Sequence, residues 1–253
     1  MIYIATHKAF DVPDIKDYMP LQVGAYNKET LGFLQDNIGE NISCKNQNYC
    51  ELTGLYWIWK NVDDAYKGLV HYRRYFGKSN LSCNINDIYS YDEMVSFLKD
   101  ADIILPYVEH FKQNAEEEIL IYCCTPEIFA KLKSIVKEKY PEYVNDFNDV
   151  FSNNKCTLFN MFFCKKKLFD SYCEWLFDIL FEMEKYVDLT QLDEYQKRLY
   201  GFLSERLLNV WVKHNNLKAK HLNIINIEMG FWQRIQLIRR RITNQIIFMI
   251  SKW

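Results

Sequence analysis

The chain has 253 residues, of which 49% are hydrophobic, 25% charged and 16% aromatic. This composition supplies enough apolar side chain for a sizeable core and excludes a disordered or fibrous protein. The 8 glycines and 5 prolines form no collagen-like, proline-rich or linker segment. With 31 Lys+Arg against 33 Asp+Glu, the formal charge of −2 provides no overall basic field for holding a nucleic acid. One large domain, or one domain with an appendage, is therefore expected.

Eight cysteines are spread through the sequence, a number that could indicate a disulfide framework. They are Cys44, Cys50, Cys83, Cys123, Cys124, Cys156, Cys164 and Cys173. The chain is long, however, and its first residues lack the basic and long apolar regions of a signal peptide. No pair has the Cys-x-x-Cys spacing of a zinc site, and the adjacent Cys123 and Cys124 are not easily bridged. We therefore expect reduced thiols in the core and a cytoplasmic location.

The hydrophobic pattern alternates between strands and helices along the chain. Residues 2–5 form a short β-branched and aromatic run that predicts a buried strand ending at the polar residues 6–8. Apolar residues at helical spacing predict a helix over 50–61, and residues 67–70 are typical of a second core strand. Further helices are expected at 91–99, 126–138, 166–186 and 193–214, and further strands at 101–105 and 157–163. This alternation predicts an α/β fold with a central, mostly parallel sheet flanked by helices.

Residues 229–253 differ in kind from residues 1–228, and we expect the two segments to form separate units. The C-terminal segment holds five cations and no acid, so that subtracting its charge from −2 leaves −7 on residues 1–228. The cations are Arg234, Arg239, Arg240, Arg241 and Lys252. Apolar residues recur at steps of three and four along one helical stripe, namely Phe231, Ile235, Ile238, Ile242, Ile246, Met249 and Trp253.

Such a basic amphipathic helix is typical of a segment that lies on an anionic membrane surface. The arginines at 239–241 interrupt the stripe, and this excludes a membrane span. The alternative is a C-terminal helix that docks on the domain or on a second subunit.

Two arginines follow the strand predicted at 67–70. They are Arg73 and Arg74, which lie close to His71. Two permanent cations thus fall within four residues at a strand end, an arrangement suited to holding a diphosphate. These cations would neutralise a departing phosphate, which is the task of a metal ion at many other sites. We therefore expect no metal and no other cofactor. The alternative is that both arginines pair with carboxylates at the surface.

Two further groups could contact a ligand. Thr6, His7 and Lys8 end the first strand, where the base, ribose or phosphate of a nucleotide could bind, although His7 could equally be a loop histidine with a partner of its own. Asn160 is the single polar residue of an apolar run and must be hydrogen-bonded if it is buried. A sugar hydroxyl and a backbone group of a neighbouring strand are equally good partners for it.

Three acids could deprotonate an attacking hydroxyl group, a task that favours a carboxyl with a raised pKa. They are Glu51, Asp193 and Glu205. Glu205 lies between apolar residues, where burial would raise its pKa, but Arg198 and Arg206 could instead make it a structural ion pair. The acidic residues at 116–118 are expected to be a solvated loop face.

Seven sequence blocks, in order, resemble the DUF4422 family over residues 1–228. They fall at 6–8, 39–43, 49–61, 71–76, 160–162, 172–177 and 201–208. The family comprises bacterial glycosyltransferases of capsule, exopolysaccharide and O-antigen gene clusters, and members with an assigned activity resemble galactofuranosyltransferases. The resemblance implies a GT-A-like (Rossmann-like) domain that moves a hexose, above all galactofuranose from UDP-galactofuranose, to a lipid-linked oligosaccharide. The acceptor implies a peripheral location at the inner face of the cytoplasmic membrane.

In enzymes of the GT-A type, the strand equivalent to 67–70 usually ends in Asp-x-Asp, which holds a divalent ion. The arginines at 73 and 74 stand there instead, and we expect an inverting, metal-independent reaction. The expected roles are nucleotide binding for Thr6, His7 and Lys8, diphosphate binding for His71, Arg73 and Arg74, sugar or acceptor binding for Asn160, Glu51, Arg198 and Arg206, and base catalysis for Glu205 or Asp193.

Two other functions remain open at this point. The enzyme could use UDP-galactopyranose or UDP-glucose, because the choice between such isomers depends on a few hydroxyl contacts. The chain could also be a non-catalytic sugar-binding subunit of a polysaccharide assembly complex. In addition, residues 119–125 replace a more polar stretch of the family, so acceptor contacts are not carried over to them.

Overall fold

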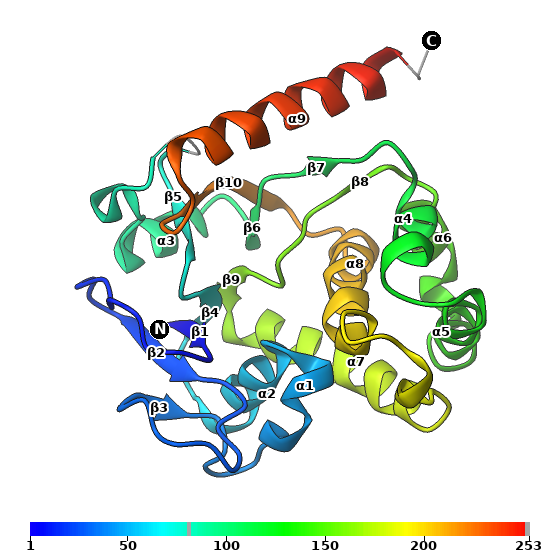
Figure 1. Ribbon diagram of the computed structural model, residues 1–253, viewed down its shortest axis with the longest axis horizontal. Coiled ribbons are helices and arrows are strands. Elements are labelled where there is room, and N and C mark those ends of the chain that lie inside the picture. Colours follow the sequence, from blue (N-terminus) through cyan, green and yellow to red (C-terminus); the bar gives the residue numbers. More distant parts are fainter. Residues whose placement is uncertain (80–81, 251–253) are drawn as a thin grey trace.

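The structure, a computed structural model, describes residues 1–79 and 82–250, and for residues 247–250 it describes the backbone alone. An eight-stranded sheet and a two-stranded sheet form its centre (Figure 1). The strands are β1 (Ile2–Thr6), β2 (Tyr18–Gln22), β3 (Leu34–Gln35), β4 (Tyr66–His71), β5 (Arg74–Gly77), β6 (Ile103–Pro106), β7 (Glu109–His110), β8 (Lys155–Cys156), β9 (Phe162–Lys165) and β10 (Ala219–Asn226). The large sheet has the order β3-β2-β1-β4-β5-β10-β6-β9, and β7 pairs with β8.

The large sheet is mixed, so the prediction of a mostly parallel sheet is wrong. Strands β3, β2, β1 and β4 run parallel to one another, whereas β5 is antiparallel to β4 and to β10, and β9 is antiparallel to β4 and to β6. Strand β4 turns back into β5 through only Tyr72 and Arg73, so that His71 pairs with Arg74. A connection this short can join only antiparallel strands. A hydrophobic run predicts a strand but not its direction, which explains the error.

Five strands of the large sheet close on themselves. Besides its pairs with β1 and β5, β4 pairs with β9, which completes the ring β4-β5-β10-β6-β9. The closure brings Gly68 of β4 opposite Phe163 of β9. A Cβ atom at Gly68 would lie 2.7 Å from the aromatic ring of Phe163. Glycine is therefore required where β4 pairs with β9.

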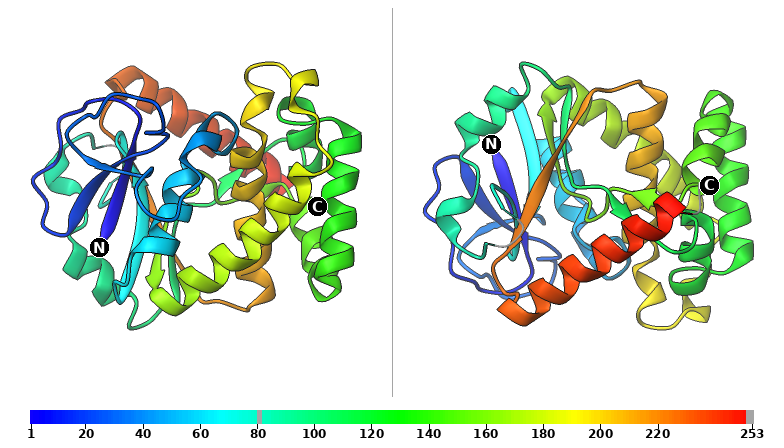
Figure 2. Two further views of the ribbon diagram at one scale, coloured as in Figure 1. Left: turned by 90° about the horizontal axis from the view of Figure 1, so that it is seen from below. Right: turned by 90° about the horizontal axis from the view of Figure 1, so that it is seen from above.

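Helices cover the sheet on both faces (Figures 1 and 2). They are α1 (Asn46–Tyr49), α2 (Leu52–Asn61), α3 (Tyr91–Phe97), α4 (Ala115–Tyr122), α5 (Pro126–Lys139), α6 (Val144–Phe151), α7 (Lys166–Glu184), α8 (Leu199–His214) and α9 (Phe231–Ile250), with short 3-10 turns that include η5 (Gln196–Arg198). Side chains alternate along β1: Tyr3 and Ala5 join the larger core with α2, α7 and α8, and Ile2 and Ile4 join a smaller core with α3. The structure is therefore an α/β fold, as predicted.

Helix α9 runs along one side of the molecule, where it contacts β7 (Figures 1 and 2). It confirms a helix within the segment predicted at 229–253. The side chain of Met249, and Lys252 and Trp253 altogether, lie outside the described residues. No helix in the part of the chain that the structure describes is long and apolar enough to cross a membrane.

Most predicted elements are confirmed to within a few residues, and three are corrected. Residues 157–161 are a loop rather than a strand, because Phe159 and Asn160 have left-handed φ angles of +81° and +51°, which a strand cannot contain. The acids at 116–118 do not lie in a loop but form the first turn of α4. Their negative charges interact favourably there with the positive end of the helix dipole.

The third correction concerns the helix predicted at 193–214, which begins only at Leu199. Asp193 Oδ1 accepts a hydrogen bond from the backbone N–H of Gln196, and Gln196 Oε1 accepts one from the N–H of Asp193. This reciprocal pair closes the turn that leads into η5, and α8 begins only after η5.

Candidate active site

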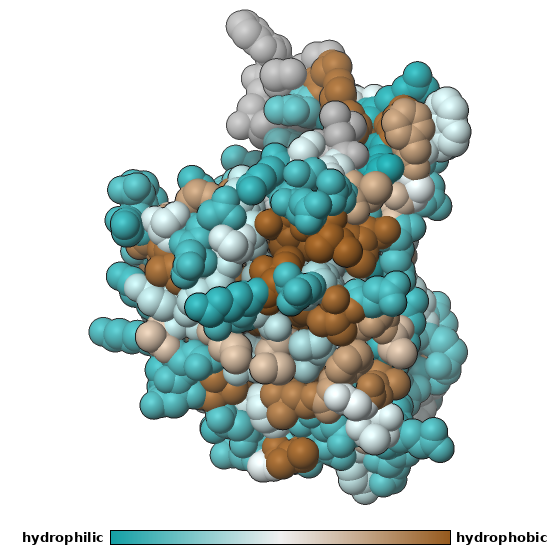
Figure 3. Space-filling model, turned by 90° about the vertical axis from the view of Figure 1, so that its left-hand side faces the viewer, coloured by the Kyte–Doolittle hydropathy of each residue, from teal (hydrophilic) through white to brown (hydrophobic). Residues whose placement is uncertain are grey.

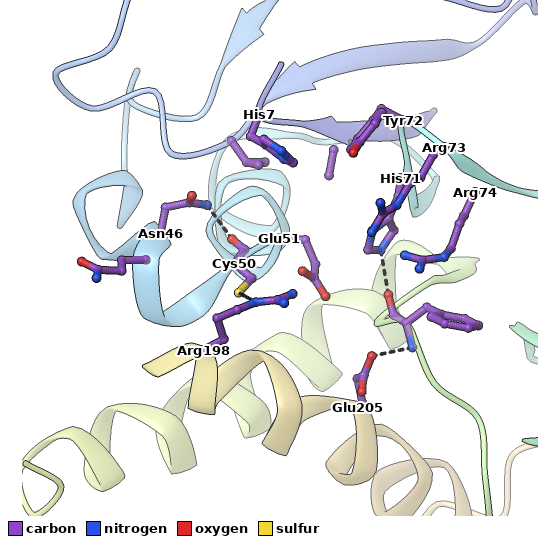
Figure 4. A pocket seen from close by; sticks show the side chains of 14 residues that line it. His7, Asn46, Cys50, Glu51, His71, Tyr72, Arg73, Arg74, Arg198 and Glu205 are labelled. Carbon is purple, nitrogen blue, oxygen red and sulfur yellow. Dashed lines mark hydrogen bonds between the residues drawn. The ribbon is translucent and has the colours of Figure 1, made fainter. Parts of the chain in front are cut away.

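A cavity of about 530 Å³ lies where β1 and β4 end, next to the turn that connects β4 to β5 (Figure 4). Elements far apart in the sequence form its wall: the strand ends, the α1–α2 junction, the loop before β9, η5 and α8. The lining residues are Ala5, His7, Val23, Asn46, Gln47, Cys50, Glu51, His71, Tyr72, Arg73, Arg74, Phe159, Arg198 and Glu205. A cavity at the carboxyl ends of parallel strands is the usual ligand site of α/β folds.

The junction between α1 and α2 presents Cys50 and Glu51 to the cavity. Cys50 interrupts the two helices with a φ of +51°. The side chain of Asn46 fixes this break, because its Nδ2 donates to the Cys50 carbonyl at 2.7 Å and to Thr53 Oγ1 at 3.0 Å. As a result, Glu51 points into the cavity instead of along a continuous helix (Figure 4).

Three arginines from two parts of the chain line the cavity. Arg73 and Arg74 come from the β4–β5 turn, and Arg198 comes from the end of η5. Within residues 1–79 and 82–250, neither Arg74 nor Arg198 has a carboxylate within ion-pair distance. Arg73 has one such partner there, Glu228, at the long distance of 3.9 Å. Burial, with a contribution from Arg73, lowers the pKa of Arg74. Cations gathered without matching acids are suited to a bound anion.

Arg74 and Arg198 are held by contacts other than ion pairs. The Arg74 guanidinium lies over the Phe159 ring at 4.8 Å from its centroid, and Arg198 Nε donates to Cys50 Sγ at 3.3 Å. Burial raises the pKa of the Cys50 thiol to about 11, so this sulfur is a neutral partner. Both guanidinium groups therefore keep most of their charge available to a ligand.

His71 is a neutral hydrogen-bond donor in this cavity. Its Nε2 lies 2.7 Å from the Phe159 carbonyl oxygen, which can only accept, so Nε2 carries the proton. Burial, followed by the nearby charge of Arg74, lowers the pKa of His71 to about 3. The second ring nitrogen, Nδ1, is therefore an unprotonated acceptor at neutral pH.

Two carboxyl groups, Glu51 and Glu205, line the cavity, and burial raises the pKa of each. They differ in how many of their carboxyl oxygens already accept a hydrogen bond from another residue. Glu205 Oε1 accepts from the Phe159 N–H at 2.8 Å, and its Oε2 accepts from Arg206 at 2.8 Å. Glu51 Oε1 accepts from Asn160 Nδ2 at 2.7 Å, while its Oε2 accepts no bond from another described residue. Glu51 is therefore the better placed of the two to take a proton from a ligand.

Arg206, predicted to bind a sugar, lies behind Glu205 and outside the cavity lining. Its side chain is 5% exposed and pairs with Glu205 at 2.8 Å and with Glu118 at 3.1 Å. Asn160 is also buried: besides Glu51, its Nδ2 donates to the Gly201 carbonyl at 3.0 Å. Both residues thus contact the carboxyl groups of the site from behind the cavity lining.

Besides Arg206 and Asn160, three further predicted site residues lie outside the cavity lining. Thr6 is buried and its hydroxyl donates to the Lys8 carbonyl at 2.5 Å. Lys8 is exposed, and its Nζ lies 3.0 Å from Glu228. Asp193 is exposed and its carboxylate accepts a hydrogen bond from the Gln196 N–H, and the structure does not bring it to Glu51 or Glu205. The remaining predicted residues, His7, Glu51, His71, Arg73, Arg74, Arg198 and Glu205, do line one cavity.

One Asp-x-Asp is present, at 100–102, but it precedes β6 instead of following a strand that ends at the cavity. Asp102 accepts a hydrogen bond from the backbone N–H of Lys218 at 2.8 Å, which ties the start of β6 to the start of β10. In the described ranges, no three His, Cys, Asp or Glu side chains are grouped so that they could hold a metal ion.

Several lining residues are not predictable from the sequence. Phe159 contributes through its backbone and its left-handed φ, which no sequence pattern indicates. Asn46 acts by fixing the α1–α2 break, and a single asparagine carries no such signal. Tyr72 and Cys50 lie within the blocks at 71–76 and 49–61, so the resemblance pointed to their segments without giving them a role.

Comparison with known proteins agrees with this architecture. A solved structure described as the apo structure of WbbM, a bifunctional glycosyltransferase, matches with a TM-score of 0.82 and 28% sequence identity. The match covers 90% of this chain but 45% of that chain, so this chain spans less than half of the WbbM chain. No curated protein matches the sequence. The model of the family described as "Domain of unknown function (DUF4422)" matches residues 1–216, and the chain therefore belongs to the DUF4422 family.

Proposed function

We propose that the chain is a glycosyltransferase that takes a hexose from a nucleoside diphosphate sugar. The observation that carries this proposal is the convergence of Arg73, Arg74 and Arg198 on one cavity that also holds two buried carboxyl groups. Such a cavity offers cations for a diphosphate and a base for a hydroxyl group, which are the two requirements of sugar transfer. The similarity to WbbM, a glycosyltransferase, supports the same reaction class.

In this proposal the diphosphate binds to the three arginines at the carboxyl ends of β1 and β4, in a GT-A-like arrangement. As the bond to the sugar breaks, negative charge develops on the leaving phosphate, and the guanidinium groups stabilise it. His71 Nδ1 accepts a hydrogen bond from the nucleoside diphosphate sugar, because the Nε2–H of His71 is already bound to the Phe159 carbonyl. Charge neutralisation by arginine is the reason for proposing that the reaction needs no metal ion.

We assign the base to Glu51 rather than to Glu205 or Asp193. Its Oε2 has no partner among the described residues, and its raised pKa suits a group that must take a proton from an acceptor hydroxyl. The hydroxyl oxygen attacks the anomeric carbon as the bond to the diphosphate breaks, and the configuration inverts. Glu205, with both oxygens bound, is a positioning residue that holds the loop before β9.

For the donor we propose UDP-galactofuranose and for the acceptor a lipid-linked oligosaccharide, on the resemblance to galactofuranosyltransferases of polysaccharide gene clusters. Such an acceptor implies that the enzyme works at the inner face of the cytoplasmic membrane. Donor specificity depends on hydroxyl contacts, so UDP-galactopyranose and UDP-glucose are compared directly in the test.

The test measures UDP release from each UDP-sugar with an alkyl galactoside as acceptor, in the presence and absence of EDTA. Arg74→Ala and Arg198→Ala are expected to lower the rate by about a hundredfold or more. Lys133→Ala removes one exposed charge on α5, outside the cavity, and serves as the control. Full activity in both arginine variants, or complete loss in EDTA, would contradict the arginine site. Sugar binding without UDP release from any donor would indicate a non-catalytic subunit instead.

A further inference from the structure

Helix α9 contacts the rest of the protein through polar side chains. Arg241 Nε donates to Glu109 Oε2 at 3.2 Å, and its guanidinium lies over the Tyr107 ring at 3.5 Å from the centroid. One turn later, Asn244 Nδ2 donates to the His110 carbonyl at 2.8 Å. Glu109 is itself 5% exposed and also lies 3.6 Å from Arg240. An ionic and hydrogen-bonded edge therefore fixes α9 to β7.

The apolar stripe of α9 is turned only partly away from this contact, because Ile235 and Ile238 are half-buried while other residues of the stripe are exposed. Phe231, Ile242 and Ile246 are 61%, 53% and 46% exposed, and Trp232 beside them is 74% exposed. Figure 3 views the left-hand side of Figure 1, where hydrophobic residues form a patch near the middle of the face. A helix that had evolved only to dock on its own domain would bury the whole stripe, as amphipathic helices of globular proteins do. The exposed part of the stripe is therefore a surface for another partner.

The charge next to the stripe indicates the kind of partner. Trp232, Arg239 and Ile246 follow one another at seven-residue spacing, so the exposed face carries a cation between apolar groups. Arg239 has no carboxylate partner in the described part of the chain, and residues 229–253 contain no acid. A partner must therefore be apolar at depth and anionic at its surface, which is the character of a bilayer with anionic headgroups.

A second copy of the chain fits this face less well. Arg239 lies near the middle of α9, so two such helices packed antiparallel through their stripes would bring the Arg239 side chains together. Neither helix has an acid to separate these like charges. An anionic lipid surface, in contrast, is attracted by the same residue.

We propose that α9 lies in the headgroup layer of an anionic membrane, with Phe231, Trp232, Ile242 and Ile246 inserted among the lipids. The contacts of Arg241 and Asn244 with β7 then hold the domain at a fixed orientation to the membrane. This surface is separate from the cavity, and the proposal does not depend on glycosyl transfer.

The experiment measures co-sedimentation of the full chain with vesicles of phosphatidylcholine, with and without phosphatidylglycerol, in the absence of donor and acceptor. Binding is expected only to the vesicles that contain phosphatidylglycerol, and it should weaken as salt is added. The double variant Ile242→Gln/Ile246→Gln is expected to weaken binding by about tenfold or more. Arg239→Gln is expected to weaken it by about fivefold, because a cation at an anionic surface contributes about that factor.

Matched controls separate this result from a general loss of apolar surface or charge. Ile38 and Ile121 are 59% and 54% exposed outside α9, so Ile38→Gln/Ile121→Gln removes comparable apolar surface. Lys133→Gln removes one exposed charge from α5. Both controls should bind like the unchanged protein. The proposal is overturned if the control pair loses as much binding as the α9 pair, if the full chain ignores phosphatidylglycerol, or if the α9 pair changes only self-association in analytical ultracentrifugation.

Discussion

His71 and Glu205 bind the two ends of the same residue, Phe159. His71 Nε2 donates to its carbonyl oxygen at 2.7 Å, and Glu205 Oε1 accepts from its N–H at 2.8 Å. Together they hold Phe159 at a φ of +81°, a conformation that a bulky residue adopts only when its surroundings impose it. The Phe159 ring then lies under Arg74, so β4 and α8 jointly position a cation of the cavity.

The His71 contact should make stability depend on pH. Burial, followed by the charge of Arg74, lowers the pKa of His71 to about 3, while an unfolded histidine titrates at about 6.5. Between these values the unfolded state binds a proton that the folded state does not, so the free energy of unfolding falls as the pH falls. Its slope should reach about 1.4 kcal/mol per pH unit, and the contribution is fully present above pH 6.5.

His71→Gln keeps a donor for the Phe159 carbonyl and removes the titration. Urea unfolding of both proteins at about pH 7 and about pH 5 should therefore show a smaller loss of stability in the variant. His7→Gln, at an exposed position, is the control and should retain most of the slope. Equal slopes in His71→Gln and the unchanged protein would contradict a buried, neutral His71.

Asn160 should be needed both for its side chain and for its backbone conformation. Its amide donates to Glu51 and to the Gly201 carbonyl and accepts from Ser204, and its φ is +51°. Asn160→Ala should lower the free energy of unfolding by about 2–4 kcal/mol, and Asn160→Gly by about 1 kcal/mol less, because glycine tolerates this φ.

Asn216 separates the two contributions, because it has a φ of +50° and is exposed. Asn216→Ala should cost only the conformational part, about 1 kcal/mol, in the same urea titrations. If Asn160→Ala costs no more than Asn216→Ala, the hydrogen bonds of Asn160 contribute no stability.

The sequence predicted the segments of the cavity better than their geometry. Strand ends and helical stripes located His71, Arg73, Arg74 and Glu205, because burial of apolar residues follows periods that can be counted. The direction of β5 and the closure of β4 on β9 depend on turns and on pairing between distant strands, which local patterns do not contain.

The role of each polar residue was harder to predict than its segment. Asn160 was placed in a strand, because the apolar residues around it hide the left-handed loop that the backbone forms there. The sequence makes Asp193 a candidate base, because its hydrogen bond with the Gln196 N–H becomes visible only once the backbone of that turn is placed. Hydrogen bonds from side chains to the backbone thus determine which carboxyl groups keep an oxygen available to a ligand.

Glu51 and Glu205 should respond differently to the same substitution. As the proposed base, Glu51→Gln should lower kcat by about a hundredfold or more while UDP binding and stability change little. Because burial raises the pKa of Glu51 and only the ionised form accepts a proton, the rate of the unchanged enzyme should fall as the pH falls through a value above the ordinary range for glutamate.

Glu205→Gln, in contrast, should lower the free energy of unfolding by about 3 kcal/mol, because it leaves the buried Arg206 with Glu118 as its one carboxylate partner among the described residues. Rates, UDP binding and thermal unfolding measured on both variants distinguish the two roles. A stable Glu205→Gln enzyme without activity, beside an active Glu51→Gln enzyme, would transfer the base to Glu205.

Glu228 should compete with the donor for two cations at the edge of the site. Its carboxylate lies 3.0 Å from Lys8 Nζ and 3.9 Å from Arg73, so it partly neutralises both cations. Glu228→Gln removes this competitor and should tighten UDP binding by about two- to fivefold, as expected for exposed pairs. The gain should disappear in high salt, which screens exposed charges.

Isothermal titration with UDP checks this expectation. Glu182→Gln is the control, because Glu182 pairs with Lys185 and Lys139 on the surface outside the cavity lining, and it should leave UDP binding unchanged. Lys8→Gln adds the reverse test: if Lys8 contacts the bound phosphates, its loss should weaken binding and reduce the gain from Glu228→Gln. Weaker UDP binding in Glu228→Gln would instead mean that Glu228 orients Arg73 toward the diphosphate, since removing a competitor cannot reduce affinity.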